Sequence, residues 1–300
     1  MQNLESLKRS IRSAEDLAGV VRTMKTMAAV SIRQYETAAE SLSLYAHTID
    51  TGLSMVLSHS SRGELDGSSP IPGQTGAVVF GSDQGMCGQF NEQIAQFTLK
   101  SLEGSGHDQI APALCIGHRV ADSLATAGIP IQQTFQLPGS ATGITALVQD
   151  LLPAIDKWRN ARRISRIQVF HNKRLSASSW QPHQIQLLPL LLNSHEHKSP
   201  LQQADADSRP NRTLPWWTMD TGVLFSRLVR QFLFVSLFRA CADSLAGENA
   251  SRIAAMQAAE RNIRDRLHLL LSDYAQRRQT MITEELLDVV TGFEALKQSY

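Results

Sequence analysis

Apolar side chains recur at helical spacing at both ends of the chain. Residues 4–57 contain no proline, and a seam of mostly small and medium side chains steps by three and four residues, as in a heptad repeat. A second helical pattern covers residues 221–296, about 75 residues or about 110 Å at 1.5 Å per residue. A seam of this length is typical of a coiled coil, so the two terminal helices are expected to pack against each other.

The last helical segment carries more apolar surface than one partner helix can cover. At about 100° per residue, its apolar side chains fill a broad arc of the helix, whereas Glu284 and Asp288 belong to a narrow polar strip. The arc includes Ile282, Leu286, Val289 and Phe293. We expect another protein to bury it.

The middle of the chain changes to the pattern of β-strands. Five apolar runs that begin near residues 76, 111, 129, 164 and 183 are predicted strands, and helical stretches near 91–102, 119–127 and 144–158 lie between the earlier ones. This alternation predicts a Rossmann-like α/β domain with a largely parallel sheet. Polar segments rich in turn residues, 58–76 and 193–213, are predicted connectors, and Asp220 is a predicted N-cap.

The predicted fold is therefore an α/β fold with a long antiparallel coiled coil of N- and C-terminal helices and an inserted Rossmann-like domain. Residues 1–58 form the N-terminal coiled-coil helix, 76–192 the α/β foot domain, and 220–296 the C-terminal coiled-coil helix.

Composition indicates an ordinary folded chain. The 300 residues are 42% hydrophobic and 19% charged, which argues against disorder. Lys and Arg number 29 and Asp and Glu 28, so the net charge of +1 gives no reason to expect a nucleic-acid partner.

Cysteine and histidine spacing indicates neither a disulfide framework nor a metal site. Cys87, Cys115 and Cys241 are odd in number, far apart and without a CxxC pair. His195 and His197 are two residues apart in a polar segment, whereas two zinc ligands on one helix face require a spacing of four.

Two observations argue against a membrane-inserted or secreted protein. The first thirty residues contain no apolar core of a signal peptide. The most hydrophobic stretch, which begins at Val223, is interrupted by Arg227, Arg230 and Arg239, so it is predicted to be buried by protein on most sides rather than to span a bilayer.

The segment GSDQGMCG, residues 81–88, follows a predicted strand and precedes a helix, where a phosphate-binding loop would lie. A Walker loop would continue with lysine and a hydroxyl residue, but Gln89 and Phe90 follow Gly88. The glycine spacing also differs from G-x-G-x-x-G. The pattern therefore favours a tight structural turn over a nucleotide site.

Three segments resemble the gamma subunit of F-type ATP synthases. The N-terminal segment LKRSIRSAEDLAGVVRTMKTMAAVSIRQYE resembles an I-x-S segment followed by K-A-M-x-M-V-A-A-S-K. GSDQGMCGQFN resembles S-D-x-G-L-C-G-G-x-N. ENASRIAAMQAAERNI and YAQRRQTMITEELLDVV resemble E-x-A-A-R-M-x-A-M and N-x-x-R-Q-x-x-I-T-x-E-[LI]. Ile32 and Gln89 depart from these patterns, and this divergence resembles the alternate F-type ATPases that are thought to move sodium.

The resemblance implies a rotor subunit without catalytic residues, cofactor or metal, present once per complex. Its coiled coil would turn inside a ring of alpha and beta subunits, and its α/β foot would join the epsilon subunit and the membrane c-ring. Neither nucleic-acid binding nor direct membrane insertion is implied. The expected location is peripheral, on the cytoplasmic face of the cell inner membrane.

The resemblance also implies two groups of contacts with the beta subunits. One group meets a polar catch loop and consists of Arg278, Gln279 and Thr283, with Glu285 beside them. Next to it, Ile282, Leu286, Val289 and Phe293 would turn against a hydrophobic sleeve. The second group would face the acidic lever segment of beta and consists of Met24, Lys25, Cys87 and Arg252.

Two other functions remain open at this point. One is an α/β nucleotide-binding enzyme, which the missing lysine after the GSDQGMCG segment disfavours. The other is a coiled-coil adaptor that bridges partners without rotating, which only the family motifs disfavour.

Overall fold

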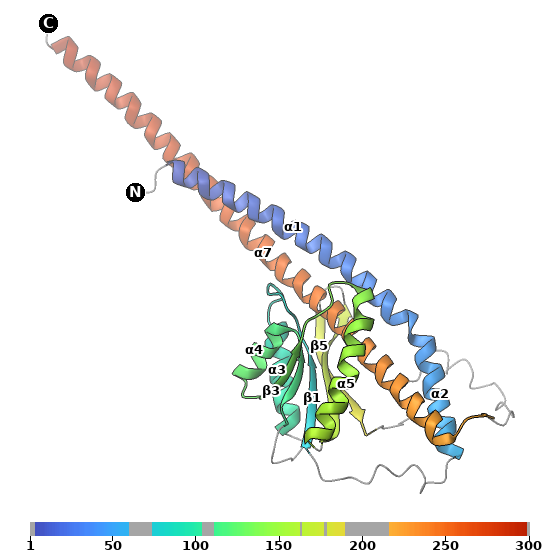
Figure 1. Ribbon diagram of the computed structural model, residues 1–300. Helices are drawn as coiled ribbons and strands as arrows, with labels where there is room; N and C mark the ends of the chain where they lie inside the picture. Colours follow the sequence, from blue (N-terminus) through green and yellow to red (C-terminus); the bar gives the residue numbers. More distant parts are fainter. Residues whose placement is uncertain are drawn as a thin grey trace.

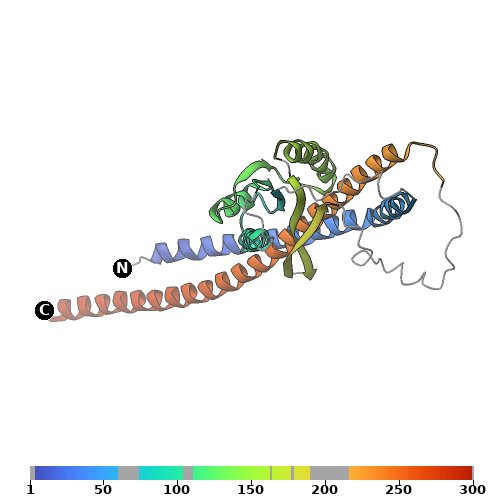
Figure 2. The ribbon, with the colours of Figure 1, turned by 90° about the horizontal axis from the view of Figure 1, so that it is seen from below.

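The two ends of the chain form an antiparallel pair of helices that extends far beyond an α/β unit (Figures 1 and 2). Helix α1 spans Leu4–Ser41, α2 spans Ser43–His59, and α7 spans Thr221–Gln298, a single helix of 78 residues. The Lys25 Nζ atom lies 2.5 Å from Glu260 Oε2. Further down, the Tyr45 hydroxyl donates to Gln231 Oε1 at 3.1 Å. These pairs define the antiparallel register, so the predicted pairing of the terminal helices is confirmed.

The structure is a computed structural model that describes residues 4–59, 74–103, 111–162, 164–176, 179–189 and 216–298, without the side chains of 58–59 and 295–298. Most of the two predicted connectors, and with them His195 and His197, lie outside the described residues.

Small side chains allow α1 and α7 to approach each other closely. Ala28 and Ile32 of α1 form a buried cluster with Ala250 and Ile253 of α7. Towards the start of α1, Leu7 is also buried, with 1% of its surface exposed. A seam of this kind buries apolar area on two helices that would each be marginal alone.

The sequence predicts one continuous N-terminal helix. In the structure this helix is interrupted at Leu42, between α1 and α2. The interruption lies between two serines, and Ser41 Oγ donates to the carbonyl of Ala38 at 2.8 Å. Serine hydroxyls compete for helix carbonyls and favour local bends, which periodicity alone does not reveal.

The inserted unit contains the five predicted strands. They are β1 (Gln74–Phe80), β2 (Ala113–Ile116), β3 (Ile131–Phe135), β4 (Ile164–Ser176) and β5 (Ser179–Leu188). The strand order is β3-β2-β1-β4-β5. The first four strands are parallel and β5 is antiparallel to β4, which confirms the predicted largely parallel sheet.

Helices cover both faces of this sheet. Helices α3 (Phe90–Glu103) and α4 (His118–Thr126) pack on one face, where Ala77, Val79 and Cys115 are buried. Helix α5 (Ile144–Arg162), which follows the short 3-10 helix η1 (Ala141–Gly143), and the middle of α7 pack on the other face, over Val78 and Phe80. The long helix is therefore part of the core of the α/β unit.

Helix α7 approaches β4 more closely than a side chain would permit. A Cβ atom placed on Gly247 would lie 2.8 Å from the carbonyl oxygen of Asn172. One turn to either side, Ser244 and Ser251 are fully buried. Glycine is required here because the helix backbone touches the strand backbone.

The beginning of α7 is capped as predicted, because Asp220 Oδ2 accepts a hydrogen bond from the Val223 N–H at 3.1 Å. Within Thr221–Glu294, one stretch is long and apolar enough to cross a membrane by length and composition alone. The chain itself buries 22% of that stretch. The stretch that begins at Val223 is buried as predicted only where it packs on the α/β unit, as at Leu237 and Ala240, whereas Val223 itself is 45% exposed.

Replacing Gly247 by alanine is expected to destabilise the protein although alanine favours helices. Gly19→Ala is the matched control, because no described atom lies within 4 Å of the added Cβ. The control should gain up to about 1 kcal/mol in unfolding free energy. Gly247→Ala should instead lose about 1–3 kcal/mol, since α7 and β4 must move apart. The urea midpoint of tryptophan fluorescence measures both, and equal shifts would contradict the close approach.

Candidate functional site

The loop of residues 81–89 connects β1 to α3 at the carboxyl ends of the parallel strands. It lies where the strand order reverses, because β2 and β3 extend the sheet on one side of β1 and β4 on the other. In open α/β sheets this switch point is the usual place for a ligand. The surroundings of the loop therefore decide whether the chain could bind a nucleotide.

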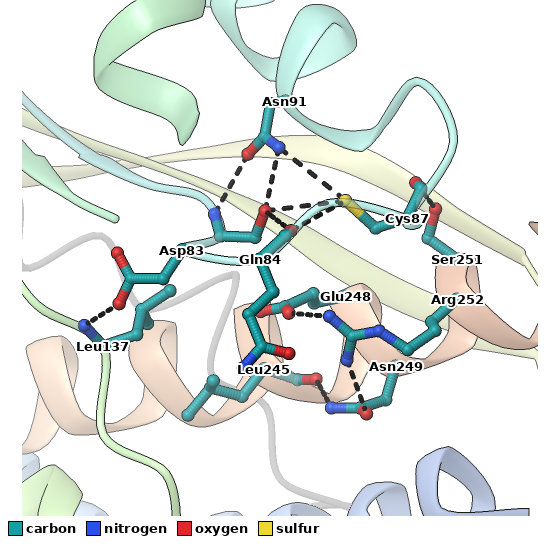
Figure 3. A network of polar contacts seen from close by, with 11 residues as sticks. Asp83, Gln84, Cys87, Asn91, Leu137, Leu245, Glu248, Asn249, Ser251 and Arg252 are labelled. Atoms are coloured by element: carbon teal, nitrogen blue, oxygen red, sulfur yellow. Dashed lines mark hydrogen bonds and ion pairs between the residues drawn. The ribbon is translucent and has the colours of Figure 1, made fainter. Parts of the chain in front are cut away.

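Side chains of the loop and of α3 close the turn on itself (Figure 3). The Ser82 N–H donates to Asn91 Oδ1 at 3.0 Å, and Asn91 Nδ2 donates to Ser82 Oγ at 2.8 Å. Ser82 Oγ in turn donates to the Gln84 carbonyl at 2.9 Å. Ser82 and Asn91 are buried, and together they satisfy the Ser82 N–H and the Gln84 carbonyl of the turn.

Asp83 ties the ends of three strands together. Its Oδ1 accepts from the His118 N–H at the start of α4, at 2.8 Å. Its Oδ2 accepts from the Leu137 N–H, just after β3, at 2.7 Å. A carboxylate at a helix N-terminus is also favoured by the helix dipole. Asp83 therefore fixes the edge of the sheet on which the loop lies.

Helix α7 covers the inner side of this loop. The Ser251 hydroxyl donates a short hydrogen bond to the carbonyl of Cys87. Met86 and Gly88 have positive φ values of 62° and 58°, which turns the chain back towards α7. On this side, the position that a ligand would take in a Rossmann-like sheet is filled by the chain's own helix.

The outer side of the loop borders an open groove of about 680 Å³ between α3 and α4. Its charged lining residues are Glu92, Arg119 and Asp122. Two carboxylates and a single guanidinium disfavour a polyphosphate, and no lysine lines the groove. The loop is thus organised as a structural turn, as its sequence indicates.

Arg252 is held on α7 directly beside this loop (Figure 3). Its guanidinium lies 2.6 Å from Glu248 Oε1 and donates to Asn249 Oδ1 at 3.2 Å. Burial raises the pKa of Glu248, and the neighbouring Arg252 opposes that rise. The ion pair therefore opposes protonation of the buried Glu248 carboxylate and fixes the Arg252 side chain.

Cys87 and Arg252 are brought together as members of the predicted lever group. The Cys87 side chain is 3% exposed, and its thiol points inward to Ser82 and Asn91. Burial raises the pKa of the Cys87 thiol. The outward side chain of the loop is instead Met86, which is 59% exposed.

Met24 and Lys25 lie further from the α/β unit on the same part of the shaft. Both are half-buried. The Lys25 ammonium is paired with Glu260, and its side chain is 33% exposed. Glu260 follows Arg252 by about two turns of α7, or about 12 Å. Met24, Lys25 and Arg252 therefore occupy one section of the helical pair, and Cys87 lies beside Arg252 on the β1–α3 loop (Figure 3).

The predicted catch group lies far from the lever group, on the free end of α7. Arg278 is about 39 Å beyond Arg252 along the helix. Every described side chain in residues 275–294 is exposed, and the last buried residue of the helix is Leu270. Gln279, Thr283 and Glu285 lie on this segment, within two turns of one another.

The apolar arc on this segment has no cover within the described part of the chain. The exposed fractions are 53% for Ile282, 63% for Leu286, 72% for Val289 and 69% for Phe293. Helix α1 begins at Leu4, and the last turns of α7 extend past this point as a single helix (Figure 1). The arc is exposed because the paired helix is too short to reach it.

A family model described as ATP synthase matches residues 3–296. The chain belongs to the ATP synthase family. Proteins named ATP synthase gamma chain are similar over 99% of this chain and 100% of their own length. The protein of Gluconobacter oxydans is 29% identical and that of Nautilia profundicola 25% identical.

Solved structures of rotary assemblies share the fold. The rotor of Euglena gracilis mitochondrial ATP synthase matches with a TM-score of 0.62 and 14% identity, over 93% of this chain and 98% of that chain. A chain of the central stalk and c-ring of Tetrahymena thermophila mitochondrial ATP synthase matches with a TM-score of 0.54 and 18% identity, over 80% of this chain and 99% of that chain.

Sequence reasoning assigned no role to Asp83, Glu248 or Ser251 of this ATP synthase family member. Asp83 lies three residues after the end of β1, where a carboxylate can cap a neighbouring helix. Ser251 follows Ser244 and Gly247 at helical spacing, and small residues on one helix face indicate a close approach. The sequence therefore contained a signal for the structural roles of both Asp83 and Ser251.

Asp83→Asn is expected to destabilise the α/β unit of this ATP synthase family member. One carboxylate oxygen becomes an amide that cannot accept from a backbone N–H, so about 1–3 kcal/mol of unfolding free energy should be lost. Asp122→Asn, at an exposed position of α4, is the control and should be nearly neutral. Urea unfolding of the two variants measures the difference. Equal midpoints would contradict the role of Asp83.

Proposed function

We propose that this chain is the gamma-type rotor shaft of an F-type ATP synthase. It would couple ion-driven rotation of a membrane ring to successive conformational changes at the beta catalytic sites. The observation that carries the proposal is the form of α7. The middle of α7 is part of the core of the α/β unit. Its free end extends beyond α1, and the apolar arc on this end is exposed.

The shaft itself contributes no catalytic residue and no cofactor site in this proposal. The GSDQGMCG loop lacks the lysine that would bind phosphate, and α7 occupies its inner side. Nucleotide chemistry would take place in the beta subunits. The chain would be a peripheral member of the complex on the cytoplasmic face of the cell inner membrane, with its α/β foot at the epsilon subunit and the c-ring.

The free end of α7 would be held by two kinds of contact. Ile282, Leu286, Val289 and Phe293 would turn against a hydrophobic sleeve, because apolar contact is non-directional and does not select one angle. Arg278, Gln279, Thr283 and Glu285 would meet a polar catch on one beta subunit at a time. Each polar contact would contribute about 1–3 kcal/mol, small enough to break within one turn.

The lever group would meet the acidic segment of beta lower on the shaft. The Lys25 ammonium is one-third exposed, so an acidic partner could share it with Glu260. Arg252 is already paired with Glu248, and its side chain is 12% exposed. Because the Cys87 thiol faces inward, contact at this loop would be made through Met86.

Rotation within a complex tests the proposal. The chain should co-purify with alpha and beta subunits as a single copy, and a probe on its α/β unit should turn while the complex hydrolyses ATP. A complex that holds the chain but never turns would favour the coiled-coil adaptor instead. An isolated chain that binds ATP would favour the nucleotide-binding enzyme.

The double variant Gln279→Ala/Thr283→Ala should lower ATP turnover far more than assembly, because the apolar arc still holds the shaft. We expect a loss of about tenfold or more per assembled complex, from two contacts of about 1–3 kcal/mol each. Gln276→Ala/Thr280→Ala is the control, with the same residue types and spacing about 60° around the helix. Loss of assembly with unchanged turnover would contradict the catch assignment.

A further inference from the structure

The α/β unit rests on a smooth face of α7. Ala240, Ser244, Gly247 and Ser251 follow one another by three or four residues, and the three with side chains are fully buried. Small side chains allow a close approach but interdigitate little. Such a face fixes the distance between sheet and helix better than it resists rolling of the sheet around the helix axis.

Larger α7 side chains such as Leu237 and Leu245 pack into the core beside this face, and directional contacts add to that packing in setting the rotational angle of the α/β unit about the shaft. One is the hydrogen bond from the Ser251 hydroxyl to the Cys87 carbonyl, which lies on α7 itself. The other is an ion pair at 2.6 Å between Arg174 Nη2, near the end of β4, and Glu36 Oε1 of α1. The second contact reaches past α7 to the other helix of the pair.

Further charges gather where β4 meets both helices. Asp243 of α7 lies 3.9 Å from His171 Nε2 of β4, and burial raises the pKa of its carboxyl group. The charges that act on Asp243 are Arg239 on its own helix, Lys173 and His183 from the sheet, and Glu36 from α1. Opposite charges from four elements thus converge on the junction that Arg174 and Glu36 join.

We propose that the pair of Arg174 and Glu36 is the off-axis tie that transmits torque between the α/β unit and the shaft. Arg174 is then a positioning residue for rotary coupling. This inference rests on the proposed rotor function. It identifies the contact through which rotation of the α/β unit would be transmitted to the paired helices.

The distance of each tie from the axis of α7 determines its effect. Packed helices lie about 8–10 Å apart, so a tie on α1 acts at about 9 Å from that axis. A contact on α7 itself acts at about 5–6 Å, the radius of a helix with its side chains. Torsional stiffness grows with the square of this distance, so the outer tie contributes most of the directional stiffness.

The test uses the assembled complex with the free end of α7 held in the head and a probe on the α/β unit. Angular fluctuations of the probe report torsional stiffness. Arg174→Gln should raise the variance of the angle by up to about fourfold, if the two ties are equally stiff. The ratio of ions pumped to ATP hydrolysed should fall with it, at an unchanged rate of hydrolysis.

Matched variants separate the tie from general damage. Glu36→Gln should produce the same rise in variance from the other side of the pair, and Arg174→Lys, which keeps the charge, should produce a smaller one. Glu36→Arg combined with Arg174→Glu should restore the wild-type variance. Arg9→Gln breaks an exposed pair with Glu5 within α1 and should leave the variance unchanged.

The outcomes distinguish this inference from the rotor function. A wild-type complex that does not turn during hydrolysis overturns both. A complex that turns, but whose variance is the same with Arg174→Gln and Glu36→Gln, overturns only the tie. Failure of the charge reversal to restore the variance also overturns it.

Discussion

Apolar contact between α1 and α7 determines the form of this molecule. Each helix has an apolar face whose exposure to water is unfavourable. The two faces bury each other although they are far apart in the sequence. Helix α7 has 78 residues, whereas α1 and α2 have 38 and 17. The unequal lengths leave the last turns of α7 alone. The free end is thus a direct consequence of how much of one helix the other can cover.

The same helix changes what the inserted sheet can do. A Rossmann-like sheet presents its switch point to solvent, and ligands bind there. In this chain α7 lies across that point, with Gly247 against Asn172 and Ser251 bonded to the β1–α3 loop. Ser82 and Asn91 bond to the backbone of the loop, and Asp83 accepts hydrogen bonds from the backbone N–H groups of His118 and Leu137. The fold serves here as a rigid attachment for a helix.

Most of the fold could be predicted from the sequence because its elements are long or strongly periodic. The terminal helices, the five strands and the Asp220 cap each depend on neighbours within a few residues. The bend at Leu42 and the fit of Gly247 depend on packing between distant segments, which one sequence does not record. For the candidate site, the sequence indicated which helices and which loop carry the lever and catch groups. It could not show that Lys25 is paired with Glu260 or that the Cys87 thiol faces inward.

The free end and the middle of α7 call for opposite kinds of interaction, and their residues differ accordingly. At the free end, large apolar side chains such as Val289 and Phe293 are exposed, and contact through them has no preferred angle. At the α/β unit, small side chains bring the backbones together, and charged groups then add direction through Arg174 and Glu36. In the proposed rotor, the free end would turn against its sleeve while the α/β unit stays fixed to the helix. Exchanging the two surface types would then fix the free end and loosen the α/β unit, so the order of these surfaces along one helix matters as much as their strength.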